Sequence, residues 1–173
     1  YCKGSYSIIC VIEHIGMICF KDNRGIRPLS YGVKDDTLLI ASESIALSSQ
    51  NYMDIKELGN DEILINEFHS KYYQIVKKQS IKQSKPVNNY PHLLNVSYTL
   101  SPCIFEWIYL ARAESIIYNV PVYNARLKMG EYLARKMLKT IEDTAKLLTY
   151  DYVIPIPDTS RPYALQISKV LGI

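Results

Sequence analysis

Glycine and proline are scarce in this chain, with 7 and 8 among 173 residues. That composition excludes collagen-like and low-complexity polymers. Neither sign of charge predominates, because the chain has 20 lysines and arginines and 17 acidic residues. A net charge of +3 does not by itself argue for binding to nucleic acid. Apolar side chains, in contrast, make up 48% of the chain, enough for a core in one or two domains. A disordered chain is therefore excluded.

Long hydrophobic runs are missing too. The longest apolar stretch near the start, residues 8–12, ends at Glu13 and His14 and is too short to span a bilayer. No charged segment followed by an apolar run marks a secretory signal. Tyr1 is not an initiator methionine, and the chain ends directly after a helical pattern. We therefore expect a cytoplasmic protein with no membrane partner, of which this chain is an internal fragment.

Cysteine and histidine show no metal-binding or triad pattern. The four cysteines are Cys2, Cys10, Cys19 and Cys103. Because they lack C-x-x-C spacing and stand among apolar neighbours, we expect reduced, mostly buried thiols and neither disulfides nor a zinc site. The histidines are His14, His69 and His92. Their turn or linker contexts favour surface roles over a catalytic triad.

The first half of the chain predicts strands and little helix. Apolar runs at 8–12 and 17–20 flank a glycine-containing turn, which is typical of a buried hairpin. Three more short strands are expected at 38–41, 62–65 and 72–76. Ser42 or Ser44 is expected to cap a brief helix through Leu47.

Lysines gather between His69 and Tyr90, a stretch without acidic residues. With the tyrosines nearby, the pattern allows an RNA-binding interpretation, in which affinity would fall steeply with added salt. A solvated edge strand that leads into a polar linker explains it better, because lysines discourage edge pairing. We therefore expect no nucleic-acid partner. The best linker is 84–91, and two unlike halves meet near 86–101.

The second half predicts α/β structure. Residues 103–111 form an apolar, strand-like run with one acid, Glu106, whose partner would be Arg112 or Arg126. Residues 124–148 carry the clearest helical pattern. Its apolar stripe consists of Leu127, Ala134, Met137, Leu138, Ile141, Ala145 and Leu148.

A strand at 152–157, a loop at 158–160 and a helix at 162–171 complete this half. Together with the preceding helix, they predict the start of a parallel α/β sheet.

The sharpest local feature is the strand-to-helix junction at Asp158, Thr159 and Ser160. The N–H groups and partial positive charge of a helix start favour an anion by about 0.3–2 kcal/mol. The hydroxyl groups could supply an oxygen ligand to a hard metal such as magnesium, and Arg161 a full charge. Since a glycine-rich phosphate cradle is absent, spacing alone favours an ordinary capped helix that begins at Pro162.

Six segments resemble, in register and in order, amidophosphoribosyltransferases, the glutamine-dependent enzymes that begin purine synthesis. They are KGSYS (3–7), GIRPL (25–29), ASES (41–44), PCIFEWIY (102–109), VYNAR with MG (122–130) and VIPIPDTS (153–160). The resemblance covers nearly the whole chain apart from residues 66–98. There are departures in loops: Asn23-Arg24 replaces Pro-Asn, Ala113 replaces Pro, and Tyr118-Asn119 replaces Asp-Gly.

The resemblance implies an α/β (α+β) fold of two coupled domains. Residues 1–98 would be the C-terminal part of an αββα N-terminal-nucleophile glutaminase domain, which frees ammonia from glutamine. Residues 99–173 would begin a type I phosphoribosyltransferase domain with a parallel α/β sheet, where ammonia attacks phosphoribosyl diphosphate. The product is 5-phosphoribosylamine, the first intermediate of de novo purine (IMP) biosynthesis.

The resemblance also implies the site residues. Asp158, Thr159 and Ser160 fall on the family's pyrophosphate-side loop, and Ser160 on the serine associated with the cofactor Mg2+. No catalytic residue is assigned, because the nucleophilic cysteine lies upstream and neither Cys2 nor Cys10 has the free α-amino group that it needs. We therefore expect this polypeptide alone to be inactive.

Further implications concern cofactors and partners. Cys103 lies where some members bind an iron–sulfur cluster, and no cluster is assigned here. Purine nucleotides would act as feedback inhibitors, and the full-length protein would form a homo-oligomer. The alternative to an enzyme is a protein of another functional class: a non-catalytic module that keeps an anion-binding helix terminus and uses its sheet to contact a partner.

Overall fold

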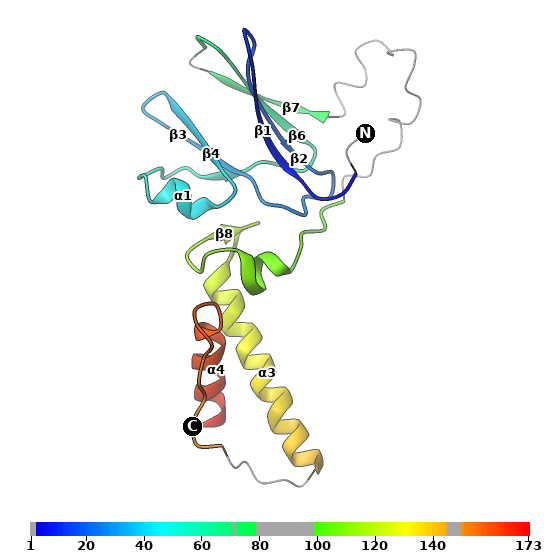
Figure 1. Ribbon diagram of the computed structural model, residues 1–173, viewed down its shortest axis with the longest axis vertical. Helices are drawn as coiled ribbons and strands as arrows, with labels where there is room; N and C mark the ends of the chain where they lie inside the picture. The colour runs from blue at the N-terminus through cyan, green and yellow to red at the C-terminus, as the bar shows by residue number, and fades with distance from the viewer. Residues whose placement is uncertain (1–2, 71, 79–98, 145–149) are drawn as a thin grey trace. The chain divides into compact units, whose positions relative to one another are not determined.

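The computed structural model describes residues 3–70, 72–78, 99–144 and 150–173 (Figure 1). The chain divides into two compact units, Tyr1–Cys103 and Ile104–Ile173. The boundary expected between residues 98 and 99 adjoins the stretch 79–98, which lies outside the described residues. That boundary and the linker at 84–91 stay predictions.

Two antiparallel sheets and a short helix form the described part of the first unit. The strand order is β1-β2-β6-β7 in one sheet and β4-β3-β5 in the other. The elements are β1 (Ser7–Ile12), β2 (Gly16–Lys21), β3 (Ser30–Lys34), β4 (Thr37–Ala41), α1 (Ser44–Ser48), β5 (Lys56–Glu57), β6 (Glu62–Glu67) and β7 (Tyr73–Lys77). The hairpin expected from the apolar runs is confirmed as β1 and β2, but it is not buried throughout, because residues 9–11 of β1 are exposed. The strands expected at 38–41, 62–65 and 72–76 are confirmed as β4, β6 and β7.

The core of this unit lies between the two sheets. Cys19 and Leu64 from the first sheet are fully buried in one cluster with Leu29, Tyr31 and Leu58. The rings of Tyr31 and Tyr73 meet edge to face, with centroids 5.6 Å apart. Such pairs add about 0.5–1.5 kcal/mol to the gain from burial. The short strands of the two sheets are therefore held together through side chains.

Two local expectations for this unit were wrong. The N-cap position of α1 is Glu43, in extended conformation, and neither Ser42 nor Ser44 occupies it; no side chain makes a capping hydrogen bond there. Cys10 is exposed, because β1 is an edge strand and Cys10 points away from the core, while Cys19 is buried as expected. Of the other two cysteines, Cys103 is half-buried and Cys2 lies outside the described residues.

The lysine-rich stretch begins, as expected, on an edge strand. β7 closes the sheet on one side, and the Lys77 ammonium makes ion pairs of 3.0 and 2.8 Å with Asp61 and Glu62. The Lys78 ammonium donates to the backbone carbonyls of Lys21 and Asn60, each at 2.7 Å. Lys71, residues 79–90 of that stretch and His92 lie outside the described residues.

Helices dominate the described part of the second unit. Its elements are η2 (Glu106–Leu110), β8 (Ile116–Ile117), β9 (Val120–Pro121), α3 (Val122–Thr144) and α4 (Arg161–Leu171). α3 and α4 lie side by side (Figure 1). The two long predicted helices are thus confirmed, although residues 145–148 of the first prediction lie outside the described residues. On the predicted stripe, Ala134 is buried and Leu127, Met137, Leu138 and Ile141 are half-buried.

The strand predicted at 103–111 was wrong, because this run forms a π-helical turn. The N–H of Ala111 donates to the carbonyl of Glu106, five residues back, at 2.9 Å. Glu106 and Trp107 are buried in succession while 108–110 are exposed. Two adjacent buried residues do not fit the alternation of a strand, whereas they fit one face of a helical turn.

The strand predicted at 152–157 was also wrong. Among the described residues it pairs with no neighbour, and the side chains of Tyr152, Ile154 and Ile156 are 82–83% exposed. A strand satisfies its backbone groups only through an adjacent strand. The parallel sheet is therefore not formed by the residues described here; the strand pair in this unit, β8 with β9, is antiparallel.

The departure at Tyr118-Asn119 preserves a tight turn. Both residues have positive φ, 49° and 61°, between the paired strands β8 and β9. Two central residues with positive φ define a type I′ turn, which usually contains Asp-Gly or Asn-Gly.

Candidate functional site

The predicted anion-binding loop immediately precedes α4. Residues 157–160 form successive turns, and Ser160 occupies the N-cap position with helical backbone angles. Its side chain makes no capping hydrogen bond; its hydroxyl donates back to the carbonyl of Ile156. The helix begins at Arg161, one residue before the expected start, and Pro162 stands in its first turn. The loop is thus closed by Ser160, while the hydroxyl oxygen keeps acceptor capacity.

Asp158 and Arg161 form an ion pair across the same loop. The carboxylate and the guanidinium approach to 2.9 Å, and their side chains are 83% and 66% exposed. An exposed pair of this kind contributes little to stability and exchanges readily with solvent ions. A bound anion could therefore take the place of Asp158 at Arg161. Both charged residues were noted in the sequence, but their ion pair forms because the turn of the loop brings the two side chains together.

Close packing holds the start of α4 against α3. A Cβ atom on Gly130 would lie 2.8 Å from the carbonyl oxygen of Tyr163 and 3.0 Å from its Cα. Only a glycine allows the backbones to approach this far. The Tyr163 hydroxyl, on α4, donates to the carbonyl of Ile108 at 3.1 Å. The candidate loop is therefore carried by a helix that is anchored on two sides.

A buried arginine on α3 contacts the end of η2. Arg126 on α3 is 2% exposed, and its guanidinium donates to the carbonyls of Trp107 and Ala111, each at 2.7 Å. The sequence suggested Arg126 or Arg112 as partner for Glu106, which is itself buried. The observed role of Arg126 differs: it satisfies backbone carbonyls at the end of η2, where cations are favoured.

A second buried polar cluster, in the first unit, was missed from the sequence. The Asp22 carboxylate accepts hydrogen bonds from the backbone N–H groups of Arg24, Ile26 and Arg27, at 3.0–3.4 Å. Lys21, fully buried, donates to Glu57 at 3.1 Å. Burial lowers the pKa of Lys21 from its usual value, against the opposing effect of Glu57. The signal in the sequence is Asp22 itself, because an aspartate in a turn can accept hydrogen bonds from backbone N–H groups that follow it.

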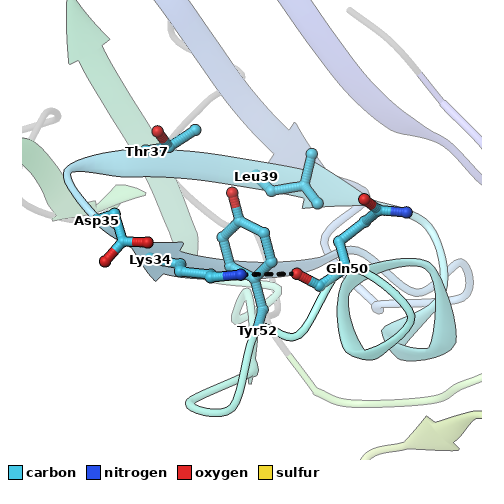
Figure 2. A pocket seen from close by; sticks show the side chains of 6 residues that line it. All are labelled: Lys34, Asp35, Thr37, Leu39, Gln50 and Tyr52. Carbon is cyan, nitrogen blue, oxygen red and sulfur yellow. Dashed lines mark hydrogen bonds between the residues drawn. The ribbon is translucent and has the colours of Figure 1, made fainter.

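A surface cavity of about 490 Å³ also lies in the first unit (Figure 2). It is lined by Lys34, Asp35, Thr37, Leu39, Gln50 and Tyr52. The Lys34 ammonium donates to the carbonyl of Gln50 at 3.3 Å. One cation and one carboxylate beside the side chains of Leu39 and Tyr52 do not favour a particular ligand class. None of the predicted site residues contributes to it.

In the part of the chain that the structure describes, no group of three or more His, Cys, Asp or Glu residues could hold a metal ion. Mg2+, however, commonly binds through one or two protein oxygens and the phosphates of its substrate. The exposed Asp158 carboxylate and the hydroxyl of Ser160 fit that mode.

Of the helices described, none combines the length and apolar character needed to cross a membrane.

Comparison with known proteins identifies relatives of this chain. No family model matches the chain. It is 36% identical over 176 residues to the amidophosphoribosyltransferase of Pseudomonas aeruginosa, 34% over 175 residues to that of Escherichia coli K12, and 32% over 177 residues to that of Saccharomyces cerevisiae. These alignments include 98–99% of this chain. The chain is homologous to amidophosphoribosyltransferases.

The homology covers a fragment of those proteins. The chain spans 30–31% of the length of these three relatives. A solved structure of glutamine phosphoribosylpyrophosphate amidotransferase from B. subtilis, complexed with ADP and GMP, matches with a TM-score of 0.74. The two are 26% identical, and the match covers 99% of this chain and 31% of that one. The resemblance to amidophosphoribosyltransferases and the mixed α/β class of the fold are therefore confirmed.

Proposed function

We propose that this chain is part of an enzyme that makes 5-phosphoribosylamine from phosphoribosyl diphosphate and glutamine, the first step of purine biosynthesis. The observation that carries the proposal is homology to amidophosphoribosyltransferases along 98–99% of the chain, which includes both units and the loop at 158–160. Because the chain spans 31% of such a relative, the reaction belongs to the whole protein.

The two units would serve different half-reactions. Residues 1–98 would belong to the glutaminase domain, of the N-terminal-nucleophile αββα type, and 99–173 to the type I phosphoribosyltransferase domain. The antiparallel sheets of the first unit and the helices of the second are compatible with that division. The nucleophilic cysteine would lie upstream of this chain.

In the transferase reaction, Asp158, Thr159 and Ser160 would bind the diphosphate. Pyrophosphate leaves as ammonia attacks the anomeric carbon, so negative charge grows on the leaving group. Backbone N–H groups and the partial positive charge at the start of α4 would stabilise that charge, and Arg161 would exchange Asp158 for a diphosphate oxygen. Ser160 would hold Mg2+, which when bound neutralises phosphate charge.

Regulation and assembly form a further part of the proposal. Purine nucleotides would inhibit the enzyme by feedback, which is supported by the ADP and GMP bound in the B. subtilis structure. The full-length protein would be a cytoplasmic homo-oligomer.

The test is Ser160→Ala in the full-length protein. Loss of a hydrogen bond to a charged group should lower kcat/KM for phosphoribosyl diphosphate by about ten- to a hundredfold, while glutamine hydrolysis remains unchanged. Ser101→Ala, at an exposed serine, is the matched control and should leave both activities at the wild-type level. Unchanged synthesis in Ser160→Ala would contradict the metal and diphosphate role. A full-length wild type that makes no phosphoribosylamine would favour the non-catalytic module instead.

A further inference from the structure

The end of η2 presents backbone carbonyls that the helix itself cannot satisfy. The last carbonyls of any helix lack a donor within it. Here side chains from two other helices supply the donors. Arg126 of α3 donates to Trp107 and Ala111, and Tyr163 of α4 donates to Ile108. The end of η2 is thus a shared anchor for α3 and α4.

Tyr163 occupies a special place in this anchor. It lies in the first turn of α4, three residues after Ser160. Its backbone is in contact with Gly130, where a Cβ would come within 2.8 Å of the Tyr163 carbonyl oxygen. Its hydroxyl also lies 3.7 Å from the sulfur of Met129. Contacts from η2 and α3 therefore meet on the residue that follows the candidate loop.

The protonation state of Tyr163 suits a donor. Burial raises the pKa of its hydroxyl above the ordinary value, and Arg126 only partly opposes that shift. The hydroxyl therefore keeps its proton at neutral pH and can donate to the Ile108 carbonyl. None of the six segments that carry the family resemblance includes Tyr163.

We propose that Tyr163 is a positioning residue for the diphosphate loop: its hydrogen bond to Ile108 fixes the first turn of α4 against η2, and so sets the direction in which Ser160 and the helix N–H groups point. This inference rests on the proposed function of that loop. Tyr163 itself does not touch the substrate. It acts through the orientation of α4.

The experiment compares Tyr163→Phe with Tyr132→Phe in the full-length protein. Tyr132, on α3, is 72% exposed. The control therefore removes a tyrosine hydroxyl that does not hold α4 against η2. Loss of one neutral hydrogen bond should raise KM for phosphoribosyl diphosphate by about fivefold in Tyr163→Phe. Because the same loop is proposed to stabilise the leaving pyrophosphate, the kcat of synthesis should fall as well, while the rate of glutamine hydrolysis should stay at the wild-type level. Tyr132→Phe should change none of these.

Two results would overturn the positioning role. One is an unchanged KM in a Tyr163→Phe enzyme that retains wild-type glutaminase activity. The other is a parallel loss of synthesis and glutaminase activity with a lower melting temperature, since that marks a general loss of stability.

Hydrogen exchange separates this inference from the proposed function. The amides of residues 164–166 should exchange faster in Tyr163→Phe than in wild type or in Tyr132→Phe, because the first turn of α4 has lost its anchor. Equal exchange in all three proteins would overturn the inference. If the wild-type protein makes no phosphoribosylamine, the proposed function fails, and the exchange rates still decide whether Tyr163 anchors the helix.

Discussion

Replacement of Gly130 by alanine tests the contact between α3 and α4. The added Cβ would lie 2.8 Å from the carbonyl oxygen of Tyr163, 3.0 Å from its Cα and 3.2 Å from the Cβ of Gln166. Two of these atoms belong to the backbone of α4, so rotation of a side chain cannot relieve the clash. α4 would have to move away as a body. The change therefore perturbs the packing of the helix that carries the candidate loop.

Two opposing effects set the change in the free energy of unfolding caused by Gly130→Ala. Alanine in place of glycine stabilises a helix interior by about 1 kcal/mol. Overpacking a tight contact costs about 1–3 kcal/mol, and close contacts with backbone atoms place Gly130→Ala at the upper end. The cost of the clash should exceed the gain in helix propensity, and we expect the free energy of unfolding to fall by about 2 kcal/mol.

Urea unfolding followed by tryptophan fluorescence measures this loss. Trp107 is the single tryptophan of the chain, and it is 9% exposed in the same unit as α3 and α4. Lys128→Ala, at an exposed position of α3, is the control and should unfold like the wild type. If Gly130→Ala were instead more stable than wild type by about the 1 kcal/mol of helix propensity, the close approach of the two helices would be refuted.

Two further predictions concern the first unit. Asp22→Asn should lower the free energy of unfolding, measured by circular dichroism in urea, by about 2 kcal/mol, because the buried carboxylate accepts charge-assisted bonds from three N–H groups; an unchanged midpoint would contradict the anchor. Burial raises the pKa of the Cys19 thiol from 9.0 to about 11, so its stabilising contribution is complete below pH 9 and is lost as the pH rises toward 11. Stability should therefore fall more steeply between those pH values in wild type than in Cys19→Ala, and equal slopes would exclude this role.

Elements with a clear local period could be predicted from the sequence. The β1–β2 hairpin follows from two apolar runs around a turn, and α3 and α4 follow from apolar residues at helical spacing. Such patterns depend on neighbours within a few residues. The position of the candidate loop at 158–160 before α4 could be predicted for the same reason, since Ser160 and Pro162 stand close together at the start of the helix.

Short apolar runs were ambiguous. Residues 103–111 and 152–157 both suited a strand, yet the first is a π-helical turn and the second pairs with no strand among the described residues. Periodicity alone does not distinguish a buried strand from a buried helical turn in so short a run. A strand also requires a partner, and nothing in its own sequence shows whether one lies beside it.

The sequence by itself determined the resemblance to amidophosphoribosyltransferases, the β1–β2 hairpin and the strands β4, β6 and β7 of the first unit, the two long helices of the second and the position of the candidate loop before α4. Tertiary structure alone decided that Arg126 satisfies the carbonyls at the end of η2 and that Tyr163 reaches Ile108, 55 residues earlier in the chain. The physical reason is distance along the chain: periodicity and capping depend on adjacent residues, whereas these contacts exist only after α3 and α4 pack at Gly130.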